Sequence, residues 1–194
     1  MKGNRLSTLP ETIAELKSLQ TLNLSFNNFR TVPDAVFNIG NSLTSLMLSN
    51  NSLTTLSPQI SRLRRLATLT LNDNELDSLP STLSELQITN LKVFHNAFTS
   101  IPPVLARMQH LEEIDLHEGK ITDVQREVVL EMATSKSLRV LNLSYNRIKT
   151  IPPELTELFM LRELDLSHNP LTAFSGKVQT MTNLKFNWQD WNSS

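Results

Sequence analysis

The sequence has no cysteine, and its 194 residues include only four glycines, two tryptophans and one tyrosine. A chain without cysteine cannot be stabilised by disulfides, which favours a reducing compartment. Four glycines leave little room for a phosphate-binding loop or a dinucleotide fingerprint, and no GxSxG sequence is present. We therefore expect no catalytic site and no cofactor.

The sequence also lacks an excess of charge and a long hydrophobic run. Its formal net charge is −1, so no basic face is expected that would favour nucleic acid or an anionic membrane. The first ten residues, MKGNRLSTLP, do not resemble a signal peptide, and no stretch is long enough to span a bilayer. Glycosylation sequons begin at Asn23, Asn50, Asn142 and Asn192, but three of them arise from a repeated motif and carry no meaning in a cytosolic protein.

A periodic motif is most complete in residues 138–161, LRVLNLSYNRIKTIPPELTELFML. Leu141 and Leu143 alternate with other residues, which predicts a short strand with one buried face. After Asn146 the apolar residues recur every three or four positions, which predicts a tight turn followed by helical or 3₁₀ turns. Because one such unit cannot bury its own apolar face, several units must stack.

The motif returns at intervals of about 23 residues, the period of a leucine-rich repeat. The units begin at Leu19, Leu43, Leu66, Ile88, Leu111, Leu138, Leu161 and Leu184. We expect one domain over residues 1–194, with a partial first repeat (1–18), seven repeats (19–183) and a partial terminal strand (184–194). The predicted fold is an α/β solenoid, curved, with a parallel sheet on the concave face and short helices or 3₁₀ turns on the convex face.

One asparagine recurs at the bend after each predicted strand. At this bend the backbone leaves regular pairing, and a buried amide side chain can bond the freed groups, each of which would cost about 1–3 kcal/mol if left unpaired. The sequence predicts a ladder of such residues at Asn27, Asn51, Asn74, Asn96, Asn146, Asn169 and Asn192, with Gly119 as the exception.

Two units depart from the motif. The unit that begins at Ile88 follows a shortened spacing and carries Phe94 and His95 where most other units have small polar residues. The unit after Gly119 is lengthened, and residues 123–137 read as an amphipathic helix. We expect Asp123 to cap this helix, with Val124, Val128 and either Leu130 or Met132 facing the core.

Both ends of the array are irregular. The chain begins in mid-repeat without a visible cap, which suggests a segment of a longer protein or an end covered by a partner. At the other end Leu184 keeps the register, but Asn187 and Gln189 stand where inward leucines belong. Trp188 and Trp191 are interpreted as a cap over the last turn, with an interaction surface as the alternative.

The sequence LxxLxLSxN followed by LPxxL, seen in residues 19–33 and 138–155, resembles the repeats of cytoplasmic Ras-associated and polarity scaffolds such as erbin and Scribble. This resemblance covers almost the whole chain and implies a curved solenoid with a binding role. Secreted relatives commonly carry disulfide-rich caps, so it also implies a cytoplasmic location. The same repeats occur beside kinase, phosphatase, cyclase and GTPase domains, which leaves a regulatory segment of a signalling enzyme as the alternative.

Parallel strands about 4.8 Å apart place equivalent residues of successive repeats in columns on the concave face. The columns are largely neutral in the first three repeats and become charged and aromatic from the fourth strand onwards. Aromatic and arginine side chains on a rigid surface are common binding anchors. We predict a protein partner site at Lys92, Phe94, His95, Asp115, His117, Glu118, Arg139, Tyr145, Arg162, Asp165 and His168.

Two other interpretations of this surface stay open. Acidic and basic residues of adjacent repeats could simply pair across the face, and such exposed pairs contribute about 0–1 kcal/mol. Alternatively, Asp115 and His117 could share a face with His95 and Glu118 and form the metal site of a small hydrolase. The chain has no recognised metal-ligand spacing, so we predict no metal site.

Overall fold

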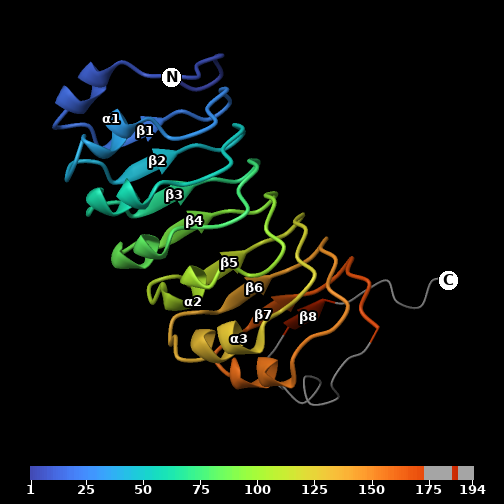
Figure 1. The fold of residues 1–194 in the computed structure, drawn as a ribbon. Helices are drawn as coiled ribbons and strands as arrows, with labels where there is room; N and C mark the ends of the chain where they lie inside the picture. The colour runs from blue at the N-terminus through green and yellow to red at the C-terminus, as the bar shows by residue number, and fades with distance from the viewer. Residues whose placement is uncertain (173–184, 188–194) are drawn as a thin grey trace.

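The computed structural model describes residues 1–172 and 185–187. It shows stacked turns with one short strand each, and from the first repeat to β6 a short helix or 3₁₀ turn lies on the opposite side (Figure 1). The strands lie side by side along the array. They are β1 (Thr21–Asn23), β2 (Ser45–Met47), β3 (Thr68–Thr70), β4 (Asn90–Lys92), β5 (Glu113–Asp115), β6 (Val140–Asn142), β7 (Glu163–Asp165) and β8 (Lys185–Asn187).

The convex side combines three short α-helices with 3₁₀ turns in the described part of the chain. These elements are η1 (Glu11–Glu15), α1 (Asp34–Phe37), η2 (Pro58–Arg62), η3 (Ser81–Glu85), α2 (Val104–Arg107), α3 (Arg126–Met132) and η4 (Pro153–Glu157). A proline directly precedes or begins most of them, because proline fixes φ at a value suited to a first turn. Among the described residues, no helix has both the length and the apolar character needed to cross a bilayer.

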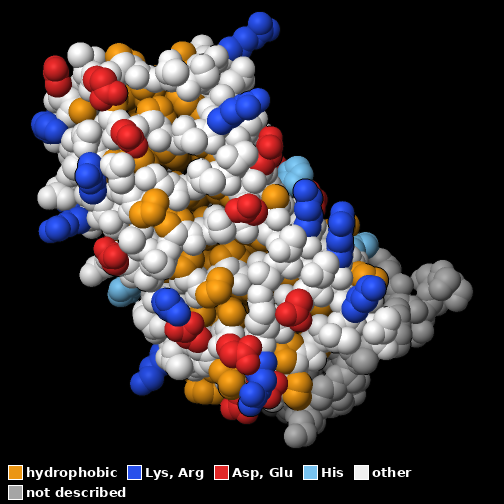
Figure 2. Space-filling view, viewed as in Figure 1, with side chains coloured by type: hydrophobic (Ala, Val, Ile, Leu, Met, Phe, Trp, Pro, Cys, Tyr) orange, Lys and Arg blue, Asp and Glu red, His pale blue; other side chains and the backbone are white. Residues whose placement is uncertain are grey.

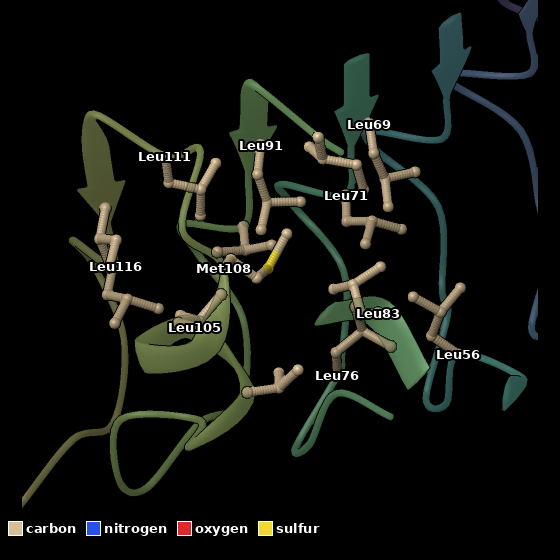
Figure 3. Packing of buried hydrophobic residues seen from close by; sticks show 14 of the residues in the cluster. Leu56, Leu69, Leu71, Leu76, Leu83, Leu91, Leu105, Met108, Leu111 and Leu116 are labelled. Carbon is tan, nitrogen blue, oxygen red and sulfur yellow. The ribbon is translucent and has the colours of Figure 1, made fainter. Parts of the chain in front are cut away.

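All strand pairs run parallel, as predicted, and equivalent apolar residues lie in register, such as Leu22 with Leu46 and Leu141 with Leu164. The strand leucines and those of the convex turns fill one continuous core. Figure 3 shows this packing in the middle of the array, where Leu69 and Leu71 point toward Leu83 of η3. The leucine-rich repeat fold predicted from the period is therefore confirmed.

The asparagine ladder has the predicted role. The amide nitrogen of Asn146 donates to the carbonyl oxygens of Leu116, Leu143 and Ser144 at 2.9–3.1 Å, and its Oδ1 accepts a bond from the Ile121 N–H at 2.9 Å. Each ladder side chain thus joins its own turn to the preceding repeat. The same set of bonds is made by Asn27, Asn51, Asn74, Asn96 and Asn169.

The ladder is interrupted at Gly119, and the sheet is interrupted beside it. The described strands form two four-stranded sheets, β1–β4 and β5–β8, with no ladder pairing between β4 and β5. Gly119 has no side-chain amide oxygen to accept a hydrogen bond from the Phe98 N–H, which corresponds to the Ile121 N–H of the next repeat. The two halves remain joined by the His95 N–H bond to the His117 carbonyl (2.9 Å) and by a bridge between Ser100 and Asp123.

The lengthened repeat contains the predicted helix, but the predicted cap is wrong. Helix α3 begins at Arg126, its N-cap is Gln125, and no side chain caps it. Asp123 instead forms the bridge with Ser100, and this extended backbone delays the helix. Val128 is buried as expected, and of the two alternatives Met132 faces the core while Leu130 is exposed.

The register predicted for the last strand is also wrong. Phe186 pairs with Leu164 and Asn187 pairs with Asp165, so Phe186 rather than Asn187 takes the position of an inward leucine. The repeat is one residue shorter than the sequence pattern indicates, and a slip of one residue exchanges the two faces of a strand. The predictions for Gln189, Trp188, Trp191 and Asn192 lie outside the described residues.

Candidate protein-binding surface

The predicted partner-site residues lie on three levels of the repeat. Arg139 and Arg162 come directly before β6 and β7, whereas Lys92, Asp115 and Asp165 end their strands. The others follow the strands, where the chain turns toward the asparagine ladder: Phe94, His95, His117, Glu118, Tyr145 and His168. The repeat therefore places five of them at or directly before the strands and six in the turns that follow the strands, interleaved with buried leucines.

Four ring side chains on four consecutive repeats form two stacked pairs. The centroids of Phe94 and His117 are 4.3 Å apart with an interplanar angle of 16°, and those of Tyr145 and His168 are 3.9 Å apart with an angle of 17°. Tyr145 remains 51% exposed. Stacking restricts the rotamers of these rings, so less side-chain entropy is lost when a partner binds them.

Two of the histidines lie against carboxylates, His95 against one from the preceding repeat and His117 against one from its own strand. His95 Nδ1 lies 2.6 Å from Asp73 Oδ1, and His117 Nδ1 lies 2.7 Å from Asp115 Oδ1. Asp73, which the sequence reasoning missed, also accepts bonds from Asn50 and Asn72. No group of three or more His, Cys, Asp or Glu side chains in the described residues is placed to hold a metal ion, so the hydrolase interpretation has no ligand set there.

The residue before each ladder position has a left-handed backbone. Their φ angles lie between 50° and 58°, and none of them is glycine: Phe26, Asn50, Asp73, His95, Glu118, Tyr145 and His168. The conformation turns the next side chain into the core, and the bonds of the ladder hold it there. These seven side chains consequently form a regular column beside the strands.

Besides Asp73, the sequence reasoning missed an aromatic member of this column. Phe26 is 48% exposed, in the half of the surface that the sequence indicates to be neutral, and Lys2 Nζ lies 5.0 Å from its ring centroid. A cation over an aromatic face at this distance is attractive. The pattern of ladder asparagines is the signal that could have found Phe26, because every residue directly before one belongs to the column.

On the strand surface Asp115 lies within ion-pair distance of His117, but some of the pairs that the pairing interpretation suggests are not formed. No ion pair within residues 1–172 joins Glu112 or Glu113 to Arg139 or Arg162. Over the face visible in Figure 2, acidic and basic side chains are interspersed, in keeping with the formal net charge of −1. The surface therefore has local charge without a field of one sign.

An ion pair on the convex side lies away from these residues. Arg126 of α3 donates from Nε to Glu154 Oε1 of η4 at 2.6 Å. This hydrogen bond lowers the pKa of the Glu154 carboxyl and raises the pKa of the Arg126 guanidinium. Because the pair joins two neighbouring convex elements, it is interpreted as structural.

Comparison with protein families identifies one model, described as leucine rich repeat, which matches residues 17–76 and 109–171. The unmatched residues between these ranges contain β4 and α2. A search of curated proteins finds no match.

Several solved structures have the same fold. A leucine-rich repeat protein of Leptospira interrogans is 34% identical, with a TM-score of 0.84, over 95% of this chain and 46% of its own. The ectodomain of the Arabidopsis thaliana membrane receptor kinase GASSHO1/SCHENGEN3, solved with CASPARIAN STRIP INTEGRITY FACTOR 2, is 29% identical, with a TM-score of 0.71, over 95% and 23%. The Toll–Spatzle complex of Drosophila contains a chain that is 27% identical, with a TM-score of 0.79, over 94% of this chain and 25% of its own. This chain thus spans less than half of each.

Proposed function

Because this chain belongs to the leucine-rich repeat family, we propose that it is a non-enzymatic protein-binding module that uses the concave face between β4 and β7. Extended concave faces are the usual binding surfaces of stacked repeats. The observation that carries the proposal is the run of ring side chains Phe94, His117, Tyr145 and His168, partly exposed on a rigid scaffold. Aromatic side chains of this kind dominate the energy of many interfaces.

The comparisons support a polypeptide as the partner. The plant receptor ectodomain and Toll are both described in complex with another named factor. The matched family model describes a structural repeat and no catalytic domain. The site residues of this proposal are the eleven predicted from the sequence, from Lys92 to His168.

Loss of the half-buried Phe94 ring or of the exposed Tyr145 ring should weaken partner binding without unfolding the chain. We expect Phe94→Ala and Tyr145→Ala each to weaken binding at least tenfold, about 1.4 kcal/mol, because each removes an aromatic contact from the proposed interface. The measurement is affinity capture from a cell lysate, with the captured protein identified by mass spectrometry and its affinity measured for each variant.

Phe26→Ala is the matched control for this experiment. Phe26 has the same left-handed backbone and similar exposure to Tyr145, but it lies beside β1. Binding should stay within twofold of the unchanged protein in this variant. If Phe26→Ala weakens capture as much as Tyr145→Ala, or if neither ring variant weakens it, the proposed surface is wrong.

A second candidate function is the regulatory segment of a larger signalling enzyme. This candidate is favoured by the short span of the chain, which covers 23% of a receptor-kinase ectodomain. Sequencing the complete transcript discriminates between the two functions. An additional catalytic domain in the reading frame would support the second, and a frame that ends at Ser194 without one would contradict it.

We also propose that the protein is cytoplasmic and is similar to scaffolds such as erbin and Scribble. The proposed domain organisation is a single domain of seven repeats with a partial unit at each end. The absence of cysteine supports the location. The sequon at Asn142 is also better explained as part of the repeat than as a glycosylation site. Asn142 lies on the strand surface, and its Oδ1 accepts bonds from the Ser144 N–H and hydroxyl. A glycan there would cover the proposed interface.

A further inference from the structure

Residues one and three positions after each ladder position point outward along one side of the array. After Asn146, for example, Arg147 and Lys149 are exposed while Ile148 between them is buried. This alternation is that of an extended segment with one buried face. Backbone bonds hold neighbouring turns together here, such as the bond from the Arg147 N–H to the Ile121 carbonyl oxygen at 2.8 Å. We call these outward residues the flank, which in the turns after β3–β6 consists of Glu75, Asp77, Ala97, Thr99, Lys120, Thr122, Arg147 and Lys149.

The charges of the flank are separated along the array. The turn after β3 carries two carboxylates, the turn after β4 is neutral, and the turns after β5 and β6 carry three cations. Figure 2 shows Lys and Arg side chains of the second half of the array close together along the right-hand edge, where Figure 1 places the turns that follow the strands. The charged flank residues of these turns, all exposed, are Glu75, Asp77, Lys120, Arg147 and Lys149.

These charges are not neutralised within one copy of the chain. In the described residues none of the five takes part in an ion pair, and the carboxylates of Glu118 and Asp123, near Lys120 in sequence, form none with it. The acidic turn after β3 and the fully basic turn after β6 are three repeats apart, about 14 Å at the spacing of parallel strands. Because the Debye length is about 8 Å at physiological ionic strength, the two turns scarcely attract each other.

A second copy of the chain, reversed end to end, matches this pattern. In a two-fold symmetric pair the same surface of both copies forms the contact. With the axis beside the junction between β4 and β5, the turn after β3 of one copy faces the turn after β6 of the other. Glu75 then faces Arg147, and Asp77 faces Lys149, because the members of each pair hold equivalent positions in their turns. The neutral turn after β4 faces the turn after β5, so like charges of the flank do not meet.

From this complementarity we infer that the flank joins two copies of the protein in an antiparallel, two-fold symmetric dimer. By symmetry, each of the two charge pairs forms twice. Exposed ion pairs contribute little each and are screened by salt, so the dimer is weak and dissociates at high ionic strength. Complementary charges chiefly fix the orientation of the two copies. This dimer is additional to the proposed function, since the strand residues of the concave face lie outside the flank.

Two charge-reversal variants test the dimer. Glu75→Lys/Asp77→Lys makes the acidic turn basic, and Arg147→Glu/Lys149→Glu makes the basic turn acidic. All four side chains are exposed, so both variants should keep the fold, which circular dichroism checks.

The control variant is Arg64→Glu/Arg65→Glu. It also exchanges two cations for two carboxylates, at exposed residues that precede β3 and lie off the flank. It therefore changes the net charge by the same amount as Arg147→Glu/Lys149→Glu.

Sedimentation velocity of the purified protein, from about 5 to 200 µM in about 50 mM NaCl, measures the dimer. We expect each flank variant alone to weaken dimerisation at least tenfold and the control to change it less than twofold. Raising NaCl to about 300 mM should weaken the dimer of the unchanged protein strongly. An equimolar mixture of the two flank variants should restore the dimer, because every flank contact of the mixed pair again joins opposite charges.

An unchanged protein that stays monomeric at the highest concentration in 50 mM NaCl would overturn the inference, even if Arg147→Glu/Lys149→Glu loses a captured acidic protein. A mixture of the two folded flank variants that stays monomeric would also overturn it. A dimer that neither flank variant weakens would show that association uses another surface. Because sedimentation uses the purified protein alone, its result is independent of the captured partner and of the proposed function.

Discussion

Asn146→Ala is expected to lower the free energy of unfolding by about 3–4 kcal/mol. The substitution removes all four side-chain hydrogen bonds of Asn146, to the Ile121 N–H and to the carbonyl oxygens of Leu116, Leu143 and Ser144. These groups lie at the bend, and Asn146 is only 6% exposed, so water replaces the lost partners poorly. A buried polar group without a partner costs about 1–3 kcal/mol, and partial relaxation keeps the total below the sum of four.

Urea unfolding followed by circular dichroism measures this effect. For a chain of this size the expected loss corresponds to a decrease in Tm of roughly 6–15 °C. Asn74→Ala removes the same four types of bond at a half-buried site and should destabilise the chain less. Asn28→Ala, at an exposed asparagine beside the ladder, should change the free energy by less than about 0.5 kcal/mol. Equal stability of Asn146→Ala and Asn28→Ala would contradict the role of the ladder.

Gly119→Asn, which restores the repeat motif in sequence, is expected to destabilise the protein by about 1–3 kcal/mol. The motif alone predicts the opposite, because an asparagine at this position should bind the Phe98 N–H and stabilise the junction between β4 and β5. The geometry excludes this result, since a Cβ atom at Gly119 would lie 2.7 Å from Asn146 Oδ1. That oxygen belongs to a side chain held by four hydrogen bonds and cannot move without breaking them.

A double-mutant cycle isolates the cause of the Gly119 effect. Gly119→Ala adds only the Cβ atom, and its cost should largely disappear in the Asn146→Ala background, where the opposing oxygen is absent. Strictly additive free energies would show that the contact between the two side chains is not responsible. An increase in stability for Gly119→Asn would indicate that the missing ladder bond, rather than the contact, limits this junction.

Much of the proposed binding surface could be predicted from the sequence, but its internal contacts could not. The repeat period predicts that Phe94 and His117 share one column and that Tyr145 and His168 share the next, because equivalent positions of stacked repeats form columns. It did not indicate that these rings stack in pairs or that Asp73 binds His95. Such contacts depend on rotamers and on the spacing between residues that lie more than 20 positions apart in the chain.

Errors in the sequence reasoning occurred where a neighbouring repeat overrides a local preference. Asp123 is a favourable cap residue, yet its backbone bridges Ser100 of the preceding repeat and the helix starts later. In the last strand, pairing with β7 aligns Phe186 with Leu164 and shifts the register by one residue. Local propensity cannot detect either effect, because both arise from backbone pairing with another repeat.

The amino-acid sequence by itself determined the repeat, the parallel strands, the leucine core and the asparagine ladder. These features follow from the alternation of side chains along one strand and from the need of each bend for a buried amide, and the sequence of one repeat indicates both. Only the tertiary structure decided the left-handed column, the stacked rings and the interruption between β4 and β5 at Gly119. Each of these depends on how closely one repeat packs against the next. The sequence of a single repeat does not determine this separation between repeats.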